Sequence, residues 1–316
     1  MAGERVHPSW VVPGGVNAPL APAVRDRILA GLPAARQIAR RTLQFFKGVV
    51  DGFQEEIAAF GTTPTMYAGM TDADGGMQFY AGRLRFLDPQ GEIAAQVTAR
   101  DYAQSIGEEP LPNSYLKAPF YKPLGFPAGV YRVGPLARLN VAGRCGTPEA
   151  DLEFAEFHQR YGRVVESSFH YHYARLIEII HALEKMESLL ADPALLDTHV
   201  RAHAGVNALE GVGMIEAPRG VLIHHYRVDE QGAIRWANLI VATGHNNLAI
   251  NRSIDQVSRR FVDGGRLQEG MLNRVSAVVR AYDPCLSCST HNLGEPALAI
   301  DLVAADGTLL DRQTNC

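Results

Sequence analysis

Residues 149–191 have the sequence EADLEFAEFHQRYGRVVESSFHYHYARLIEIIHALEKMESLLA, the longest helical pattern in the chain. The apolar side chains of this stretch recur every three or four positions, which places them on one face of a helix. They are Phe154, Phe157, Tyr161, Val164, Val165, Phe169, Tyr173, Leu176, Ile180, Leu183 and Met186. The pattern predicts a central core helix, with Gly162 as its candidate break.

A second helical pattern covers residues 24–60. Pro33 lies inside it, and proline removes a backbone donor and crowds the preceding turn of a helix. We therefore expect two helices in this region, separated near Pro33. Residues 253–262 and 268–280 have apolar residues at similar spacing and are also expected to be helical.

Short apolar runs flanking turn residues predict β-hairpins at 77–99, 220–242 and 297–311. Their turns are DPQG, DEQG and DG, which supply the backbone conformations that a tight hairpin needs. Residues 1–23 and 105–140 are dense in proline and glycine, so we expect them to be irregular. The expected fold is α+β, predominantly helical with peripheral β-hairpins, built as one large domain.

Length and composition exclude several classes of protein. A chain of 316 residues that is 47% apolar and 20% charged can bury a large core and is too apolar to be disordered. Its formal charge of -4 gives no broad attraction for nucleic acid or an anionic membrane. No apolar run approaches the ~18 residues of a membrane span, and the first residues lack a secretory signal, so a cytoplasmic location is expected.

The sharpest chemical signal is DPCLSCSTH at residues 283–291. Cys285 and Cys288 can direct two sulfurs at one metal ion, and His291 can add an imidazole, a ligand set that favours a transition metal. A single C-x-x-C supplies only half of a tetrahedral thiolate site, however. A structural zinc ion, a redox dithiol and a catalytic metal all remain open, although a thioredoxin-like role is disfavoured because the motif follows a helix.

This motif resembles the D-P-C-x-x-C-x-x-H signature of nickel-iron hydrogenase large (alpha) subunits. Four other segments are similar to the same family in the same order: HPSWVVPGGVN at 7–17, YRVGPLARLNV at 131–141, GVGMIEAPRGVLIHHYRV at 211–228 and ANLIVATGHNN at 237–247. They are most similar to the cytoplasmic, bidirectional, NAD-linked branch. The resemblance implies the large-subunit fold and an oxidoreductase that cleaves hydrogen reversibly and heterolytically, passing electrons to a small iron-sulfur subunit.

The resemblance also implies the metal ligands. Cys285 would be a terminal nickel thiolate, and Cys288 would bridge nickel to an iron that carries cyanide and carbon monoxide. His291 would end the mature chain and hold a nearby magnesium or iron(II) ion. The backbone carbonyl of Asn247 is a weaker candidate for the same ion.

Three further residues match the family's site around these ligands. Pro218 and Arg219 would cover the diatomic ligands of the iron, and Arg219 is the first catalytic candidate that is not a ligand, because a guanidinium can hydrogen-bond cyanide. Asp283 would pair with Arg219 and fix its orientation. The plainer interpretation of Asp283 and Pro284, a helix stop followed by a turn, is compatible with that role. Isolated histidines are assigned no function: His170, His172, His181, His224, His225 and His245.

The family's upstream R-x-C-G-x-C-x-x-x-H motif, which supplies the other two nickel thiolates, is absent from the sequence, and Cys145-Gly146 repeats only two of its letters. We therefore expect a truncated or split large subunit that is inactive alone. Residues 1–291 would form the large-subunit domain without that motif, and residues 292–316 an extension removed on maturation.

The resemblance implies several partners: the small iron-sulfur subunit, diaphorase-type subunits, a maturation endopeptidase and nickel chaperones. The alternatives are a truncated or split subunit without catalytic activity, a metal-free relative of the kind found in respiratory complexes, and a stand-alone zinc or redox protein. Retention of Cys285, Cys288 and His291 argues against the metal-free relative.

Overall fold

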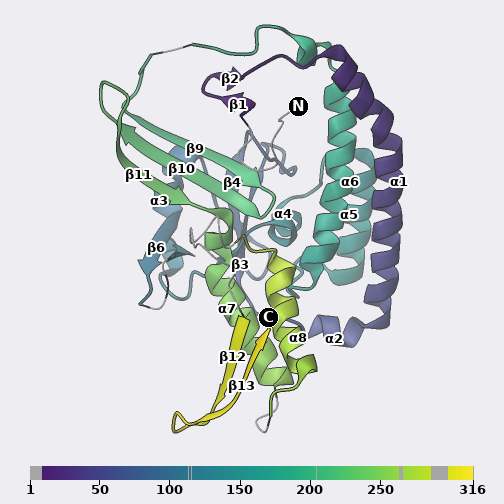
Figure 1. Ribbon diagram of the computed structural model, residues 1–316, viewed down its shortest axis with the longest axis vertical. Helices are drawn as coiled ribbons and strands as arrows, with labels where there is room; N and C mark the ends of the chain where they lie inside the picture. The colour runs from purple at the N-terminus through teal and green to yellow at the C-terminus, as the bar shows by residue number, and fades with distance from the viewer. Residues whose placement is uncertain are drawn as a thin grey trace.

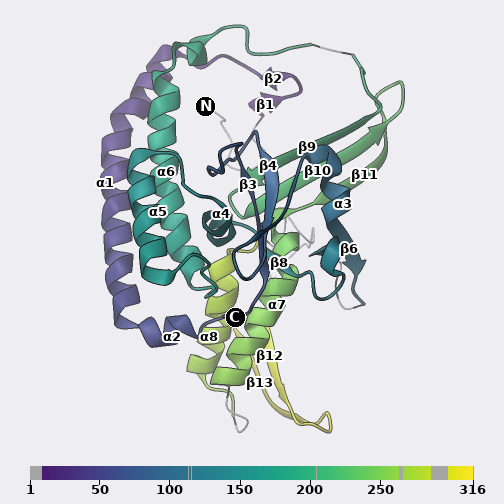
Figure 2. The same cartoon turned by 180° about the vertical axis from the view of Figure 1, so that it is seen from behind.

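The computed structural model describes residues 9–112, 114, 116–203, 205–262, 266–285 and 298–315. Long helices form one side of the molecule, and the two larger sheets form the other (Figure 1). The view from behind shows the same division, with the short helix α4 (Pro135–Val141) between the two sides (Figure 2). The expected α+β, predominantly helical fold is confirmed.

The helical side is built from α1 (Pro22–Gly52), α5 (Pro148–Tyr161) and α6 (His170–Ala191), and the short α2 (Gln54–Ala58) follows α1 in the chain. The long helices lie side by side (Figures 1 and 2). Their shared core contains large side chains with almost no exposed surface: Leu43, Phe157, Tyr173 and Ile177. The expected break is confirmed, because Gly162 ends α5 with a φ of +89°, a conformation that favours glycine.

The expected interruption at Pro33 is wrong. Helix α1 runs through Pro33 for 31 residues, and the chain breaks instead at Phe53, between α1 and α2. Pro33 removes one helical hydrogen bond, but the neighbouring Leu32 is buried against Leu20 and Leu190. Packing of the apolar face on α6 keeps the helix continuous where local propensity predicts a break.

The four-stranded sheet contains β3 (Met66–Thr71), β4 (Arg83–Leu87), β5 (Ile93–Val97) and β8 (Tyr131–Arg132). Its strand order is β5-β4-β3-β8, and β3 and β8 run parallel. The three-stranded sheet contains β9 (Glu210–Ala217), β10 (Gly220–Val228) and β11 (Ile234–Ile240). Its order is β11-β10-β9, and it is antiparallel. The predicted hairpins are confirmed as β4–β5, β10–β11 and β12–β13, whereas β3 and β9 had no sequence-based prediction. The last hairpin consists of β12 (Leu298–Val303) and β13 (Leu309–Asn315).

The expectation that residues 105–140 are irregular is wrong. They contain a hairpin of β6 (Ile106–Pro110) and β7 (Lys117–Tyr121), the strand β8, and the helix α4. The prolines occupy tolerated positions: Pro119 lies in a two-stranded sheet, and Pro135 is the first residue of α4, where its missing N–H is not needed. The short helical turns nearby are η1 (Ala99–Asp101), α3 (Tyr102–Ser105) and η2 (Lys122–Leu124).

The irregular start of the chain is confirmed for residues 9–21, which contain only the two-residue strands β1 (Val11–Val12) and β2 (Gly15–Val16). The turn η3 (Pro193–Leu196) follows α6. Both helices expected in the last third are present, as α7 (Ala242–Phe261) and α8 (Glu269–Tyr282). Among the described residues, no helix combines the length and the apolar character that a membrane crossing requires.

Candidate metal centre at the end of helix α8

Cys285 lies just after the end of helix α8. The helix ends at Tyr282, Asp283 adopts the left-handed conformation with φ 52° and ψ 51°, and Pro284 cannot continue the helix. The backbone N–H of Cys285 then donates a hydrogen bond to Thr243 Oγ1 at 3.1 Å. Thr243 is buried in the first turn of α7, so the position of Cys285 is fixed against that helix.

Arg219 approaches the same point from the sheet. Pro218 and Arg219 form the turn between β9 and β10, because Ala217 pairs with Gly220. Arg219 Nη2 donates to Asp283 Oδ1 at 3.2 Å, and Arg219 Nε lies 3.2 Å from Asp283 Oδ2 and also donates to the Asp283 backbone carbonyl. The guanidinium is therefore bound to Asp283, the residue that follows α8 and lies two positions before Cys285.

The β9–β10 turn is packed tightly against Val133 and Gly134. A Cβ on Gly134 would lie 2.7 Å from the backbone oxygen of Arg219, and a Cβ on Gly220 would lie 2.3 Å from Val133 Cγ2. Gly134 and Gly220 have φ values of +92° and +132°, which side chains rarely tolerate. Glycine at these two positions lets the turn approach the chain ahead of α4.

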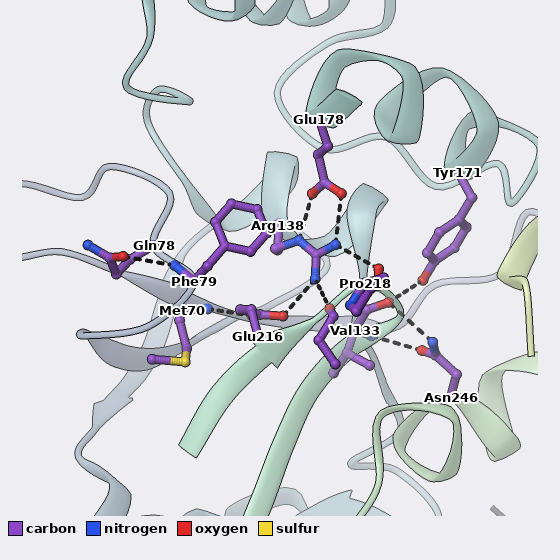
Figure 3. A network of polar contacts seen from close by, with 11 residues as sticks. Met70, Gln78, Phe79, Val133, Arg138, Tyr171, Glu178, Glu216, Pro218 and Asn246 are labelled. Carbon is purple, nitrogen blue, oxygen red and sulfur yellow. Dashed lines mark hydrogen bonds and ion pairs between the residues drawn. The ribbon is translucent and has the colours of Figure 1, made fainter. Parts of the chain in front are cut away.

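Val133 is in turn held by side chains from two helices (Figure 3). Its N–H donates to Asn246 Oδ1 at 2.8 Å, and its carbonyl accepts from Asn246 Nδ2 at 3.2 Å and from the Tyr171 hydroxyl at 2.9 Å. Asn246 lies on α7, as does Thr243. The first turns of α7 thus contact both Cys285 and the segment that supports Arg219.

The structure brings together four of the residues singled out from the sequence: Pro218, Arg219, Asp283 and Cys285. Cys288 and His291 lie outside the described residues. Asn247 is placed inside α7, where a backbone carbonyl normally accepts the N–H four residues later. Within the described parts of the chain, no three His, Cys, Asp or Glu side chains converge on a metal-sized site.

The described donor set fits a soft metal at the end of α8. Cys285 brings a sulfur, the donor atom that nickel and other soft transition metals prefer, and it is partly exposed rather than sealed in the core. Arg219 and Asp283 add a positioned cation and carboxylate beside it, with side chains 34% and 45% exposed, so the site remains accessible. The candidate site thus combines one cysteine sulfur with a positioned arginine and a carboxylate.

The histidines remain without a role. Burial lowers the pKa of His245 to about 3, and its Nδ1 lies 2.5 Å from the Tyr131 hydroxyl. His170 and His181 are also buried, and burial lowers the pKa of both rings. Burial therefore disfavours the charged form of all three rings.

Sequence reasoning missed the residues that support the site: Val133, Gly134, Thr243 and Asn246. Each lies in a segment that resembles the family, 131–141 or 237–247, but none has a side chain that marks a metal site by type or spacing. Their contacts join positions 38 to 113 residues apart, which no local pattern can reveal.

Comparisons with known proteins identify the family of this chain. Residues 79–291 match the family model described as nickel-dependent hydrogenase. The chain is 39% identical to the NAD-reducing hydrogenase HoxS subunit beta of Cupriavidus necator, over 98% of this chain and 66% of that protein. It is 35% identical to the vhc F420-non-reducing hydrogenase subunit of Methanococcus voltae, over 97% of this chain and 66% of that protein.

A solved structure described as an NAD+-reducing [NiFe]-hydrogenase in the H2-reduced state has the same fold. It superposes with a TM-score of 0.87 at 38% identity, covering 92% of this chain and 64% of that chain. The chain therefore spans about two thirds of the length of the relatives it matches. From the family match and the structural agreement together, the chain belongs to the nickel-dependent hydrogenase large-subunit family.

Proposed function

We propose that this chain forms part of the nickel-iron site of a hydrogenase that oxidises hydrogen reversibly to protons and electrons. The observation that carries the proposal is the meeting of Cys285 with the Arg219–Asp283 ion pair at the end of α8. These three residues come from the two segments, 211–228 and 283–291, that resemble the family's site most closely.

Cys285 and Cys288 would hold the metals, as terminal and bridging thiolates. The other two thiolates that the family uses are absent from residues 1–316 and would come from polypeptide outside this sequence. When bound, the nickel-iron centre, with cyanide and carbon monoxide on iron, supplies the Lewis acidity that heterolytic cleavage of hydrogen requires.

Arg219 would bind and orient groups at this centre. Its Nε and Nη2 bind Asp283, and its Nη1 would be the donor offered to a ligand of the metals. Asp283 holds the guanidinium in one orientation, which lowers the entropy that ligand binding would otherwise cost. Pro218 presents no backbone N–H beside this donor and fixes the local backbone.

The remaining parts of the proposal concern maturation and partners. His291 would hold a magnesium or iron(II) ion, and removal of residues 292–316 would leave it as the C-terminus. Asn247 stays the weaker candidate for that ion because its carbonyl lies inside α7. Electrons would pass to diaphorase-type subunits through a small iron-sulfur subunit, and the NAD-reducing activity named for the Cupriavidus relative supports NAD as the acceptor. A maturation endopeptidase and nickel chaperones would complete assembly.

Nickel content tests the proposal. The full chain is coexpressed anaerobically with its partner polypeptides and maturation proteins, and nickel per purified complex is measured for Cys285→Ser, Cys288→Ser and Cys145→Ser. Cys145 is the control, because it lies outside the motif, is buried, and burial raises the pKa of its thiol. Both motif variants should lose nickel, since serine oxygen is a harder ligand than thiolate. Wild-type nickel in both of them contradicts the proposal.

The mass of the chain in an active complex tests the maturation step. A chain that ends at His291 is expected. A full-length chain in a nickel-loaded, active complex would refute the assignment of residues 292–316 as a removable extension.

A further inference from the structure

Arg138 lies at the centre of a buried polar cluster between the two sides of the molecule (Figure 3). Its side chain has no exposed surface. On one side, Nε and Nη2 donate to the two carboxylate oxygens of Glu178 on α6 at 2.6 and 2.8 Å. On the other side, Nη1 donates to Glu216 Oε2 at 2.7 Å, and the ring of Phe79 covers the guanidinium at 5.2 Å.

The same guanidinium also binds the backbone just ahead of Arg219. Nη1 donates to the carbonyl of Ala217 at 3.0 Å, and Nη2 donates to the carbonyl of Pro218 at 2.9 Å. Arg138 therefore contacts three successive residues, Glu216 through its carboxylate and Ala217 and Pro218 through their carbonyls. No member of this group is a residue for which the resemblance implied a role, except Pro218.

These contacts hold the two peptide units that lead into Arg219. A backbone carbonyl fixes the plane of the peptide unit to which it belongs. The Ala217 carbonyl sets the plane that leads into Pro218, and the Pro218 carbonyl sets the plane that leads into Arg219. Both peptide planes are held by one buried fork, so the backbone that leads into Arg219 is fixed at the point from which its side chain reaches Asp283.

The cluster is itself anchored at both ends. Glu216 accepts a hydrogen bond from the backbone N–H of Met70 on β3 at 2.8 Å, and Glu178 projects from α6. The guanidinium thus ties the turn to a strand of the four-stranded sheet and to the helical side. Arginine is suited to this task because its planar fork bonds several acceptors at once, whereas lysine concentrates its donors on one nitrogen.

We propose that Arg138 is a positioning residue for Arg219, acting through the carbonyls of Ala217 and Pro218. The inference rests on the proposed function, because it concerns the geometry of the residue assigned to the nickel-iron site. A lysine at position 138 keeps the charge for Glu178 and Glu216 but cannot hold both carbonyls.

The first test is amide hydrogen exchange of the assembled complex, in peptides that cover residues 210–228. Arg138→Lys should speed exchange in the β9–β10 turn by about tenfold or more while leaving α1 and α6 protected. Arg132→Lys is the matched control, since Arg132 is equally buried but donates to Gly61, Thr63 and Glu166 and not to the turn. Unchanged exchange in the turn of Arg138→Lys, or equal acceleration in the control, overturns the proposal.

The second test is a double-mutant cycle on hydrogen uptake per nickel. Arg138→Lys should lower uptake about tenfold at unchanged nickel content, and in an Arg219→Lys background it should lower uptake less than about twofold, because the residue it positions is gone. Equal effects in both backgrounds would assign Arg138 a structural role only. If Arg138→Lys fails to assemble, Glu178→Gln replaces it in both tests, with smaller effects of the same pattern expected.

The two proposals fail in different ways. A wild-type complex without nickel contradicts the proposed function, and the exchange test then decides the role of Arg138 by itself. If the wild-type complex contains nickel but the effects of Arg138→Lys and Arg219→Lys on hydrogen uptake are additive, only the role of Arg138 is contradicted.

Discussion

The polar cluster around Arg138 and the aromatic core between α1, α5 and α6 both lie in the interior of the protein, but they contribute differently. In the cluster, five hydrogen bonds of 2.6 to 3.0 Å fix the guanidinium against two carboxylates and two carbonyls. In the core, rings such as Phe157 and Tyr173 meet edge to face at 5.1 Å without a directional bond. Directional contacts specify where a group lies, whereas buried apolar area supplies stability. We therefore expect variants in the core to reduce stability and variants at the turn to reduce turnover.

The largest effect is expected in the aromatic core. Phe157→Ala should lower the free energy of unfolding by about 4 kcal/mol, because it deletes a fully buried ring and leaves a cavity. Hydrogen uptake per nickel in whatever complex assembles should be unchanged. Urea unfolding of the full chain and the nickel-normalised rate measure the two quantities. A loss of rate per nickel as large as that of Arg219→Lys would break the division between the two regions.

The next effect concerns His170, a polar ring inside the aromatic core. Burial, together with the nearby charge of Arg160, lowers its pKa to about 4 from an ordinary value of 6.5. As pH falls below 6.5, the unfolded chain takes up a proton that the folded chain does not, so stability is lost between pH 6.5 and pH 4, by at most about 3 kcal/mol.

Urea unfolding across that pH range measures this loss. His170→Phe should remove the share of this loss that His170 contributes, while the buried His181 and His245 keep theirs. His199→Asn, a change at an exposed position, should leave the whole dependence in place. A wild-type chain and a His170→Phe chain with the same pH dependence would show that His170 is protonated in the fold.

At the site, the predicted effect is on rate. Arg219→Lys should lower hydrogen uptake about a hundredfold, equivalent to about 2.7 kcal/mol, with nickel retained, because lysine keeps the charge but loses the planar fork. Arg259→Lys is the control, since Arg259 also pairs with a carboxylate, Asp255, but on an exposed surface. An Arg219→Lys complex with undiminished uptake would remove Arg219 from the site.

The smallest effect is expected where directional contacts lie near the surface. The β12–β13 hairpin contacts the segment just before α8 through two side chains. Asp311 Oδ2 accepts from the Leu267 N–H at 2.9 Å, and Gln313 Nε2 donates to the Leu267 carbonyl at 3.2 Å. Asp311→Ala should weaken docking by about 1 kcal/mol. Faster amide exchange at Leu267 measures this, and Asp301→Asn, which alters only a pair within the hairpin, should leave Leu267 unchanged.

Local patterns predicted the parts of the fold that depend on nearby residues. The end of α5 at Gly162 and the hairpin turns follow from backbone conformations that a few residues dictate. The predictions at Pro33 and residues 105–140 were wrong for the opposite reason, because packing against distant elements overrides the local preference of proline and glycine. Helix α4 is buried along its whole length, so its surroundings decide its structure.

The residues of the candidate site also differ in whether the sequence alone could identify them. The resemblance identified Arg219, Asp283 and Cys285, and the structure places them together. Arg138 had no such signal: it is one arginine among many, and its partners lie 40 and 78 to 80 positions away in sequence. Only the folded arrangement shows that its fork meets the carbonyls ahead of Arg219.

The most direct test of the central claim is whether position 285 binds nickel. The assembled complex is prepared with selenocysteine at position 285 in place of cysteine, and the nickel environment is measured by X-ray absorption. The account predicts a selenium neighbour in the nickel spectrum and a nickel neighbour in the selenium spectrum, because the residue at the end of α8 is a direct ligand. A nickel-loaded complex whose nickel has only lighter neighbours would contradict the account.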